Sequence, residues 1–284
     1  MANNSFNMTT NRVKILNIAA YKFVALTGKR LIQLKKELNG LSKKSNLKGT
    51  ILLSKEGINL FLAGPKKDIE IFWQCFLYHR EFSGLTYKTS LSDRQPFKRM
   101  RVKIKDEIIP MDATLQPKQS NGTHLSPQEL KRWLDEGRNI TLLDTRNRFE
   151  VDFGTFKKAR HLDIKSFRSF PDAAGKLDPE LKEKPLVMFC TGGIRCEKAT
   201  PLLQQQGFKQ VYQLEGGILK YFEACGESHF EGECFVFDER ISLNSQLAET
   251  GTAQCARCFK PVTVEEQQSP EFVPGVSCPD CAEK

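Results

Sequence analysis

The chain has 284 residues, of which 39% are hydrophobic and 27% are charged, and its formal net charge is +9. This composition is typical of a globular protein, and the length allows two or three domains. The apolar runs are too short to span a membrane, and the first residues lack the apolar core of a secretory signal. Nine cysteines, four of them in CxxC pairs, favour a reducing compartment, so we expect a cytoplasmic protein.

The excess positive charge is confined to the first part of the chain. Residues 1–120 hold 22 Lys and Arg against 9 Asp and Glu, whereas the remainder holds 21 against 25. This asymmetry favours a nucleic-acid-facing domain joined to a near-neutral catalytic domain. A lysine-rich solvated surface gives the same count, and only the grouping of the charges on one face distinguishes the two interpretations.

Residues 1–110 carry the pattern of a β-α-β-β-α-β unit. Alternating or β-branched runs predict strands at 12–24, 48–54, 57–63, 86–91 and 99–104. Two apolar stripes at helical spacing predict the helices between them, and their members are Leu31, Leu34, Leu38 and Leu41, then Ile69, Phe72, Trp73, Phe76 and Leu77. We therefore expect a basic α+β domain of the ferredoxin-like or acylphosphatase-like kind.

A second domain is predicted after a linker. Residues 111–122 are rich in Pro, Asn, Ser and Gln, which is typical of a connecting segment. Ser126, Pro127 and Glu129 then form the signature of a helix start with a capping box. Strand and helix patterns alternate over residues 123–226, which predicts an α/β domain with a parallel sheet.

The most informative stretch of this domain surrounds Cys190. The apolar run 184–190 predicts a buried parallel strand, so this cysteine lies at the carboxyl end where such sheets place their chemistry. Arg195 begins a helix whose positive end faces the same point. The loop residues between them let successive backbone N–H groups converge, and these are Thr191, Gly192, Gly193 and Ile194. A thiolate, or an anion bound to it, is stabilised in such a loop.

The spacing of the loop discriminates between two kinds of cysteine enzyme. Arg195 is the sixth residue counted from Cys190, which resembles the active loop of rhodanese domains, whereas cysteine-dependent phosphatases have one more residue. We therefore expect sulfur or thiol chemistry. The structural alternative is an inert buried cysteine. Cys196 is a candidate resolving thiol, although a cysteine at a helix start more often only packs.

Asp144 and Arg146 follow the preceding strand pattern. In rhodanese domains an Asp and an Arg at this strand end brace the active loop, so the resemblance makes both residues candidates for the catalytic site together with Cys190 and Arg195. A buried pair of this kind is structural first and catalytic second.

The last segment, residues 227–284, contains two CxxC pairs. Cys255 and Cys258 are separated from Cys278 and Cys281 by nineteen residues, a spacing that suits tetrahedral zinc. Two redox motifs or an iron–sulfur site are the alternatives. Four thiolates leave no open position on the metal, so we expect a structural zinc around which the tail becomes ordered.

Four stretches together resemble the rhodanese-domain tRNA uridine hydroxylase family. They are GTILLSKEGINLFLAG, KTSLSDRQPFKRMRVKIKDEIIPM, CTGGIRCEKA with VYQLEGGILKY, and GECFVFDERISL. The resemblance implies an oxygen-dependent enzyme that forms 5-hydroxyuridine at the wobble position of tRNA, with Cys190 as nucleophile, molecular oxygen as co-substrate and the anticodon loop as partner. Phe61 and Leu62 are bulkier than the residues expected after EGIN.

The residues fit this assignment and leave two alternatives. An unpaired anticodon base can be splayed into a pocket while a basic domain holds the phosphates. The sequence contains no flavin or nucleotide motif and no cluster with iron-ligand spacing. A persulfide on Cys190 is equally compatible with the loop, so a rhodanese-type sulfurtransferase is one alternative. A noncatalytic binding module is the other, against which the intact Cys190 and Arg195 argue.

Overall fold

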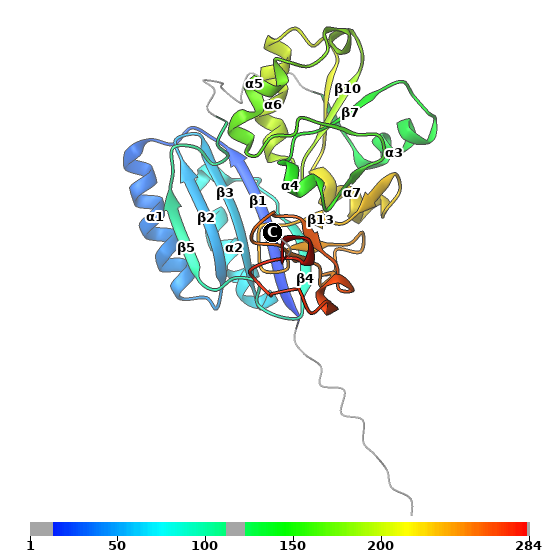
Figure 1. The fold of residues 1–284 in the computed structure, drawn as a ribbon. Coiled ribbons are helices and arrows are strands. Elements are labelled where there is room, and N and C mark those ends of the chain that lie inside the picture. The colour runs from blue at the N-terminus through cyan, green and yellow to red at the C-terminus, as the bar shows by residue number, and fades with distance from the viewer. Residues whose placement is uncertain (1–13, 112–122, 283–284) are drawn as a thin grey trace, which may run out of the picture.

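The computed structural model describes residues 14–111 and 123–282, which form two sheet-containing domains and a C-terminal extension (Figure 1). The linker predicted at 111–122 lies outside the described residues except for Met111, which is buried. Among the helices in the described ranges, none combines the length and the apolar character needed to cross a bilayer.

The N-terminal domain is a five-stranded sheet with two helices on one face. Its strands are β1 (Ile15–Phe23), β2 (Lys48–Ser54), β3 (Gly57–Gly64), β4 (Lys88–Ser92) and β5 (Met100–Ile104), in the order β4-β1-β3-β2-β5. Helices α1 (Gly28–Lys43) and α2 (Lys66–Leu77) are the predicted amphipathic pair. The predicted acylphosphatase-like arrangement is confirmed, and β5 extends it by pairing in parallel with β2.

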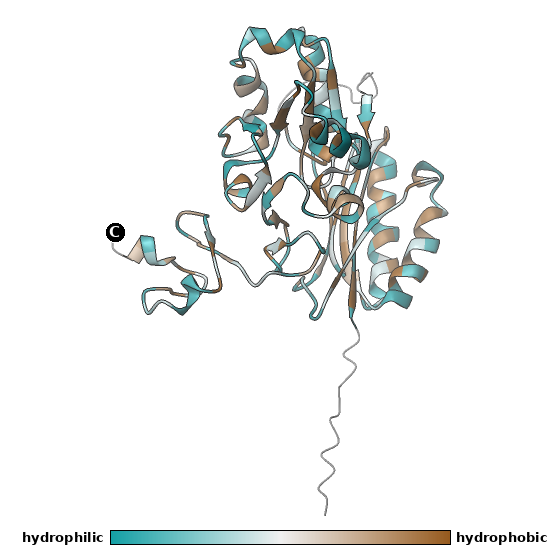
Figure 2. Ribbon diagram, turned by 90° about the vertical axis from the view of Figure 1, so that its right-hand side faces the viewer, coloured by the Kyte–Doolittle hydropathy of each residue, from teal (hydrophilic) through white to brown (hydrophobic). Residues whose placement is uncertain are grey.

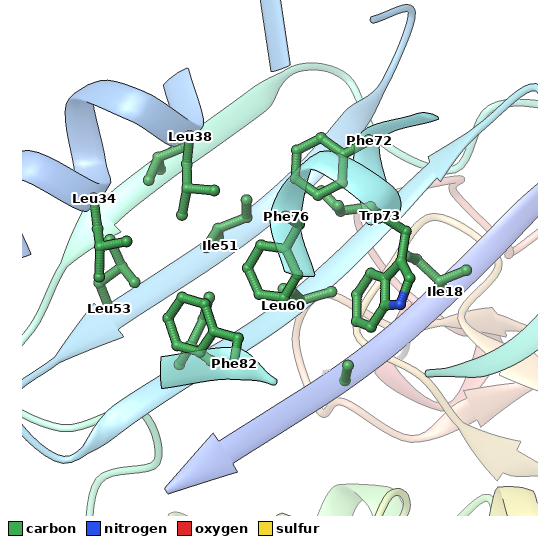
Figure 3. Close-up of a cluster of buried hydrophobic side chains, with 14 of the residues drawn as sticks. Ile18, Leu34, Leu38, Ile51, Leu53, Leu60, Phe72, Trp73, Phe76 and Phe82 are labelled. Carbon is green, nitrogen blue, oxygen red and sulfur yellow. The ribbon is translucent and has the colours of Figure 1, made fainter. Parts of the chain in front are cut away.

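The core of this domain lies between the sheet and the helices (Figure 3). Side chains alternate along a strand, so every second residue points toward the helices. Leu34 and Leu38 of α1 and Trp73 and Phe76 of α2 pack on one sheet face, and Trp73 is a core residue as expected. The opposite face, which carries Asn17, Tyr21, Asn59 and Phe61, is left for the rest of the molecule.

The second domain is built on a parallel sheet, as predicted. Its strands are β6 (Thr123–Leu125), β7 (Thr141–Asp144), β9 (Arg160–His161), β10 (Leu186–Phe189) and β11 (Val211–Leu214), in the order β6-β11-β10-β7-β9. Helices α5 (Phe170–Ala174) and α6 (Ile194–Gln205) pack on one face, and α3 (Pro127–Asp135) and α7 (Gly217–Cys225) pack on the other. The central strand β10 is buried along its whole length, which explains its continuous apolar sequence.

The C-terminal extension begins by adding to this domain and then leaves it. β12 (Phe230–Gly232) pairs with β8 (Gly154–Phe156), and two short hairpins follow, formed by β13 (Cys234–Phe235) with β14 (Ser242–Leu243) and by β15 (Ala253–Gln254) with β16 (Pro261–Val262). A short helix, α8 (Pro279–Ala282), ends the described chain. The last part reaches away from the two larger domains (Figure 2).

Buried polar contacts fix the N-terminal sheet against the rest of the molecule. Lys198 of α6, with a side chain only 2% exposed, forms ion pairs with Glu56, at 2.8 Å, and with Glu107. Arg240 of the extension donates to the hydroxyl of Ser90 on β4 at 2.7 Å. The open face of the N-terminal sheet is therefore turned toward the loop that follows β10.

Candidate active site

Cys190 stands directly after β10 and is fully buried. The backbone N–H of Gly193 donates to its sulfur at 3.1 Å. Gly193 has φ +95°, a left-handed conformation that favours glycine, and it precedes the first residue of α6. The loop thus aims backbone donors and the start of a helix at one sulfur, as the sequence indicated.

The surroundings of Cys190 favour its thiolate. Burial by itself raises the pKa of the thiol, but a hydrogen bond from the Cys196 thiol, the charge of Arg195 and the N–H groups of Arg195 and Gly193 lower it to about 5. At neutral pH the sulfur is therefore ionised and nucleophilic.

Cys196, in the first turn of α6, is the opposite case. Its thiol is fully buried, and burial together with the neighbouring Cys190 thiolate raises its pKa well above the usual value. It also lies 3.9 Å from the hydroxyl of Thr145. All nine cysteines lie in the described ranges and none of them forms a disulfide. Because its pKa is raised, Cys196 stays protonated and donates a hydrogen bond to the sulfur of Cys190.

Arg195 points into the protein beneath the loop. Its two terminal nitrogens donate to the two carboxylate oxygens of Glu150 at 2.6 and 2.7 Å. Glu150, on the short helix α4 (Arg148–Val151), is fully buried and also accepts from the backbone N–H of Asn147 at 3.1 Å. Sequence reasoning missed this carboxylate, although its position three residues after Asn147 is the spacing of a capping box.

Asp144 and Arg146 form a second buried pair, with a contact of 2.6 Å. Arg146 also donates to the carbonyl of Gly154 at 2.6 Å, and the hydroxyl of Thr155 donates to Asp144 at 2.8 Å. These contacts tie the end of β7 to β8, while the partner of Arg195 is Glu150. A catalytic contribution of Asp144 and Arg146 stays a prediction.

The N-terminal domain reaches the loop through two side chains that sequence reasoning did not select. The ammonium of Lys88 on β4 donates to the carbonyl of Gly192 at 2.8 Å. The hydroxyl of Tyr21 on β1 donates to Glu197 of α6 at 3.2 Å, and the Lys88 nitrogen lies 5.4 Å from the Tyr21 ring centroid. Lys88 and Gly192 are 104 positions apart, so no local pattern could have paired them.

A cavity of about 470 Å³ opens beside Cys190, with walls from all three parts of the molecule. The N-terminal sheet contributes the face opposite its helices, including Asn17, Asn59 and Phe61. The loop contributes Cys190, and the extension contributes Phe237, whose surface is 56% exposed. This volume lies within the roughly 300–1,000 Å³ typical of ligand pockets, and aromatic walls suit a planar ring.

The four cysteines of the tail converge as their spacing predicted. Their sulfur atoms all lie within 4.8 Å of one another, and those of Cys258 and Cys278 are 3.7 Å apart. Tetrahedral zinc with bonds of about 2.3 Å separates its sulfur ligands by about 3.8 Å. Three backbone N–H groups donate to the sulfur of Cys255, which favours a thiolate. The cluster therefore fits a metal with four sulfur ligands.

Comparison with known proteins matches each of the two domains to a family model. A family model described as a UPF0176 acylphosphatase like domain matches residues 15–108, and a rhodanese-like domain model matches residues 126–224. The chain is 50% identical over 275 residues to the tRNA uridine(34) hydroxylase of Cupriavidus taiwanensis, covering 95% of this chain and 97% of that protein. The chain belongs to the tRNA uridine(34) hydroxylase family. A second family member, from Ralstonia nicotianae, is 47% identical over 277 residues and covers 95% of this chain and 98% of its own.

The similar solved structures each cover less than half of this chain. The rhodanese-like domain of an Anabaena protein is 26% identical and covers 38% of this chain and 78% of its own, with a TM-score of 0.32. A human single-domain sulfurtransferase is also 26% identical and covers 37% of this chain and 98% of its own, with a TM-score of 0.32.

The two bulky residues of this family member, Phe61 and Leu62, have different positions. The side chain of Leu62 is fully buried in the core between the sheet and the helices, although this residue also borders the cavity beside Cys190. Phe61 is on the opposite face and lines the cavity beside Cys190. Phe61 therefore shapes the space available to a ligand, and Leu62 acts on the stability of the domain.

Proposed function

We propose that this protein hydroxylates C5 of the wobble uridine in tRNA, with Cys190 as the nucleophile and molecular oxygen as the co-substrate. The observation that carries the proposal is the Cys190 thiolate at the wall of a cavity shared by three parts of the chain. Family membership supports it, since the relatives named above are called tRNA uridine(34) hydroxylases.

The chemistry begins with the thiolate. A lone pair of the Cys190 sulfur forms a bond to C6 of the uracil ring, and the electrons of the C5–C6 double bond shift toward C5 and O4. C5 then bonds to an electrophilic oxygen derived from O2. Loss of the C5 proton restores the double bond and releases the thiolate. One oxygen atom enters the product and the other becomes water. The proposal includes a soluble reductant of the thiol class, which is oxidised to its disulfide and supplies the two electrons and two protons that complete the balance.

Binding of the anticodon loop is proposed for the same side of the N-terminal sheet. Arg101 and Lys103 on β5 are exposed, and they pair in register with Thr50 and Leu52 of β2, which line the cavity. Laterally paired residues share a sheet face, so the basic side chains flank the cavity. Phosphate contacts at this edge bring an unpaired base toward Cys190.

The tail is proposed to hold a structural zinc ion through Cys255, Cys258, Cys278 and Cys281. Four sulfur ligands complete the coordination of the metal and leave no position for a substrate. The proposed compartment is the cytoplasm, where free thiols persist and where tRNA is available.

The test is nucleoside mass spectrometry of tRNA from a host that lacks the gene. Wild-type protein should restore 5-hydroxyuridine derivatives, Cys190→Ser should not, and the control Cys75→Ser should restore them, because Cys75 lies on α2 away from the cavity. If Cys190→Ser restores the modification, the assignment of Cys190 as the nucleophile is wrong. If the modification is independent of the gene while cyanide-trapped sulfur transfer requires Cys190, the protein is a sulfurtransferase.

A further inference from the structure

The loop turns consecutive carbonyl groups away from the sulfur of Cys190. The carbonyl of Cys190 accepts from the N–H of Ile218 at 2.9 Å, and that of Thr191 accepts from the N–H of Leu219 at 3.1 Å. Both donors belong to the first turn of α7. The second domain thus supplies its own partners for two loop carbonyls and keeps their negative ends away from the thiolate.

The third carbonyl, that of Gly192, is held by the other domain. It accepts from the ammonium of Lys88 at 2.8 Å. The same peptide unit ends in the N–H of Gly193, which donates to the sulfur of Cys190 at 3.1 Å. A trans peptide is planar and its C=O and N–H point in opposite directions, so a cation that fixes the oxygen also fixes the direction of the hydrogen.

This peptide depends on such an anchor because it joins two glycines. Glycine backbones rotate at low cost, and a rotation of this unit would turn the carbonyl toward the thiolate. Lys88 also has an electrostatic effect. Its positive ammonium, hydrogen-bonded to the carbonyl oxygen of Gly192, polarises the peptide and strengthens the hydrogen bond from the Gly193 N–H to the Cys190 sulfur. The ring of Tyr21, 5.4 Å from the lysine nitrogen, helps to place the ammonium.

We propose that Lys88 is a positioning residue of the thiolate site, which acts by holding the Gly192–Gly193 peptide with its N–H directed at Cys190. The N-terminal domain then has two tasks, since it forms a wall of the cavity and completes the environment of the nucleophile contributed by the other domain. This inference deepens the proposed function, because it rests on Cys190 being the reactive group.

The charged groups around Lys88 come from several elements. Burial lowers the pKa of the Lys88 ammonium, and the charge of Lys220 lowers it further. The negative groups of Cys190, Glu197 and Glu215 raise it. Because the nearby negative groups include the thiolate itself, removal of the lysine charge must destabilise that thiolate.

The experiment is a pH titration of thiolate ultraviolet absorbance in the full-length protein without tRNA. Subtracting the curve of Cys190→Ser isolates the signal of Cys190. In Lys88→Met we expect the midpoint to rise by about one pH unit, the low end for loss of an opposite charge close to the titrating group. Lys88→Arg should stay close to the parent, since it keeps a charged donor.

The control is Lys22→Met. Lys22 also donates to a backbone carbonyl, that of Ser83 at 2.7 Å, but within the N-terminal domain. The titration midpoint of Cys190 in this variant should equal that of the parent protein. An unchanged midpoint in a Lys88→Met protein with the parent's circular dichroism spectrum overturns the proposal. If Lys88→Met does not fold, Lys88→Gln is titrated instead, and an unchanged midpoint there overturns it equally. The titration uses no substrate, so it is independent of whether the enzyme hydroxylates uridine.

Discussion

The molecule uses cysteine in two regions that are organised in opposite ways. In the loop after β10, a single sulfur is surrounded by a large apolar core and receives donors from a folded backbone. In the tail, four sulfurs lie within 4.8 Å of one another, and the small core that contains them has three buried members, Cys255, Val262 and Cys278. The protein fold therefore organises the loop for its thiolate, whereas the tail gathers four sulfurs in an arrangement that could bind a metal. The residue type is the same, and the surrounding structure decides its chemistry.

Metal removal should separate the two regions most strongly. A strong chelator should release zinc and make the tail beyond residue 252 sensitive to limited proteolysis, since structural zinc contributes about 10–16 kcal/mol in small domains. The titration midpoint of Cys190 should not move. If the chelated protein keeps a protease-resistant tail, or if the parent protein contains no zinc by elemental analysis, the structural role of the metal is wrong.

Loss of the carboxylate beneath the loop is the next largest expected effect. Glu150→Gln leaves Arg195 buried without its charge partner, which should lower the free energy of unfolding by about 3–5 kcal/mol. Urea denaturation measures the change. Glu183→Gln, which removes one partner of an exposed pair with Lys209, should change stability by less than about 1 kcal/mol. Equal effects of the two substitutions would mean that the buried pair of Glu150 with Arg195 stabilises the protein no more than an exposed pair does.

The reactivity of Cys190 should depend on pH with a defined direction. Its pKa is lowered to about 5 in the folded protein, so the thiolate predominates above that pH and is lost as the pH falls through it. The lowered pKa also stabilises the folded state. This contribution is fully present above the pKa of the unfolded thiol and is lost as the pH falls through about 5. The rate of iodoacetamide labelling at Cys190, read by peptide mass spectrometry, should be flat between pH 7 and 8. A labelling rate that still rises steeply in that interval would mean an ordinary thiol.

Cys196 should show a smaller and more specific effect. Cys196→Ala removes the thiol that donates to Cys190, and we expect the pKa of Cys190 to rise by about one unit, equivalent to about 1.4 kcal/mol. Cys196→Ser keeps a donor and should stay close to the parent. Comparison of the two variants by thiolate titration isolates the hydrogen bond from the packing of the side chain. If the pKa of Cys190 shifts equally in Cys196→Ala and Cys196→Ser, the effect comes from the packing of the side chain and not from the hydrogen bond.

The parts of the site that were predictable from the sequence are those encoded locally. Cys190, the glycines and Arg195 lie within six residues, and each CxxC pair places two ligands on one short turn. The helices of the N-terminal domain were equally readable, because leucine spacing records which side faces the sheet.

The parts that were not predictable depend on chain segments meeting in space. Glu150 and Arg195 are 45 positions apart, and an acidic residue in a short helix gives no indication of its distant partner. Lys88 was one of many lysines in a basic domain, and only the docking of β4 against the loop distinguishes it. For Asp144 and Arg146, the pattern marked a polar strand end, but the direction of their side chains toward β8 required the fold.

The pairing of Lys198 with Glu56 and Glu107 also bears on how such chains change over evolutionary time. The lysine belongs to the helix that begins at the active loop, and both carboxylates belong to the neighbouring domain. Replacing both carboxylates leaves the charge of Lys198, whose side chain is 2% exposed, in a buried position without its ion pairs, and replacing the lysine removes the cation that both carboxylates share. Across related chains these three positions are therefore expected to vary together, and exchanging one domain for that of a distant relative should fail unless all three residues are exchanged with it.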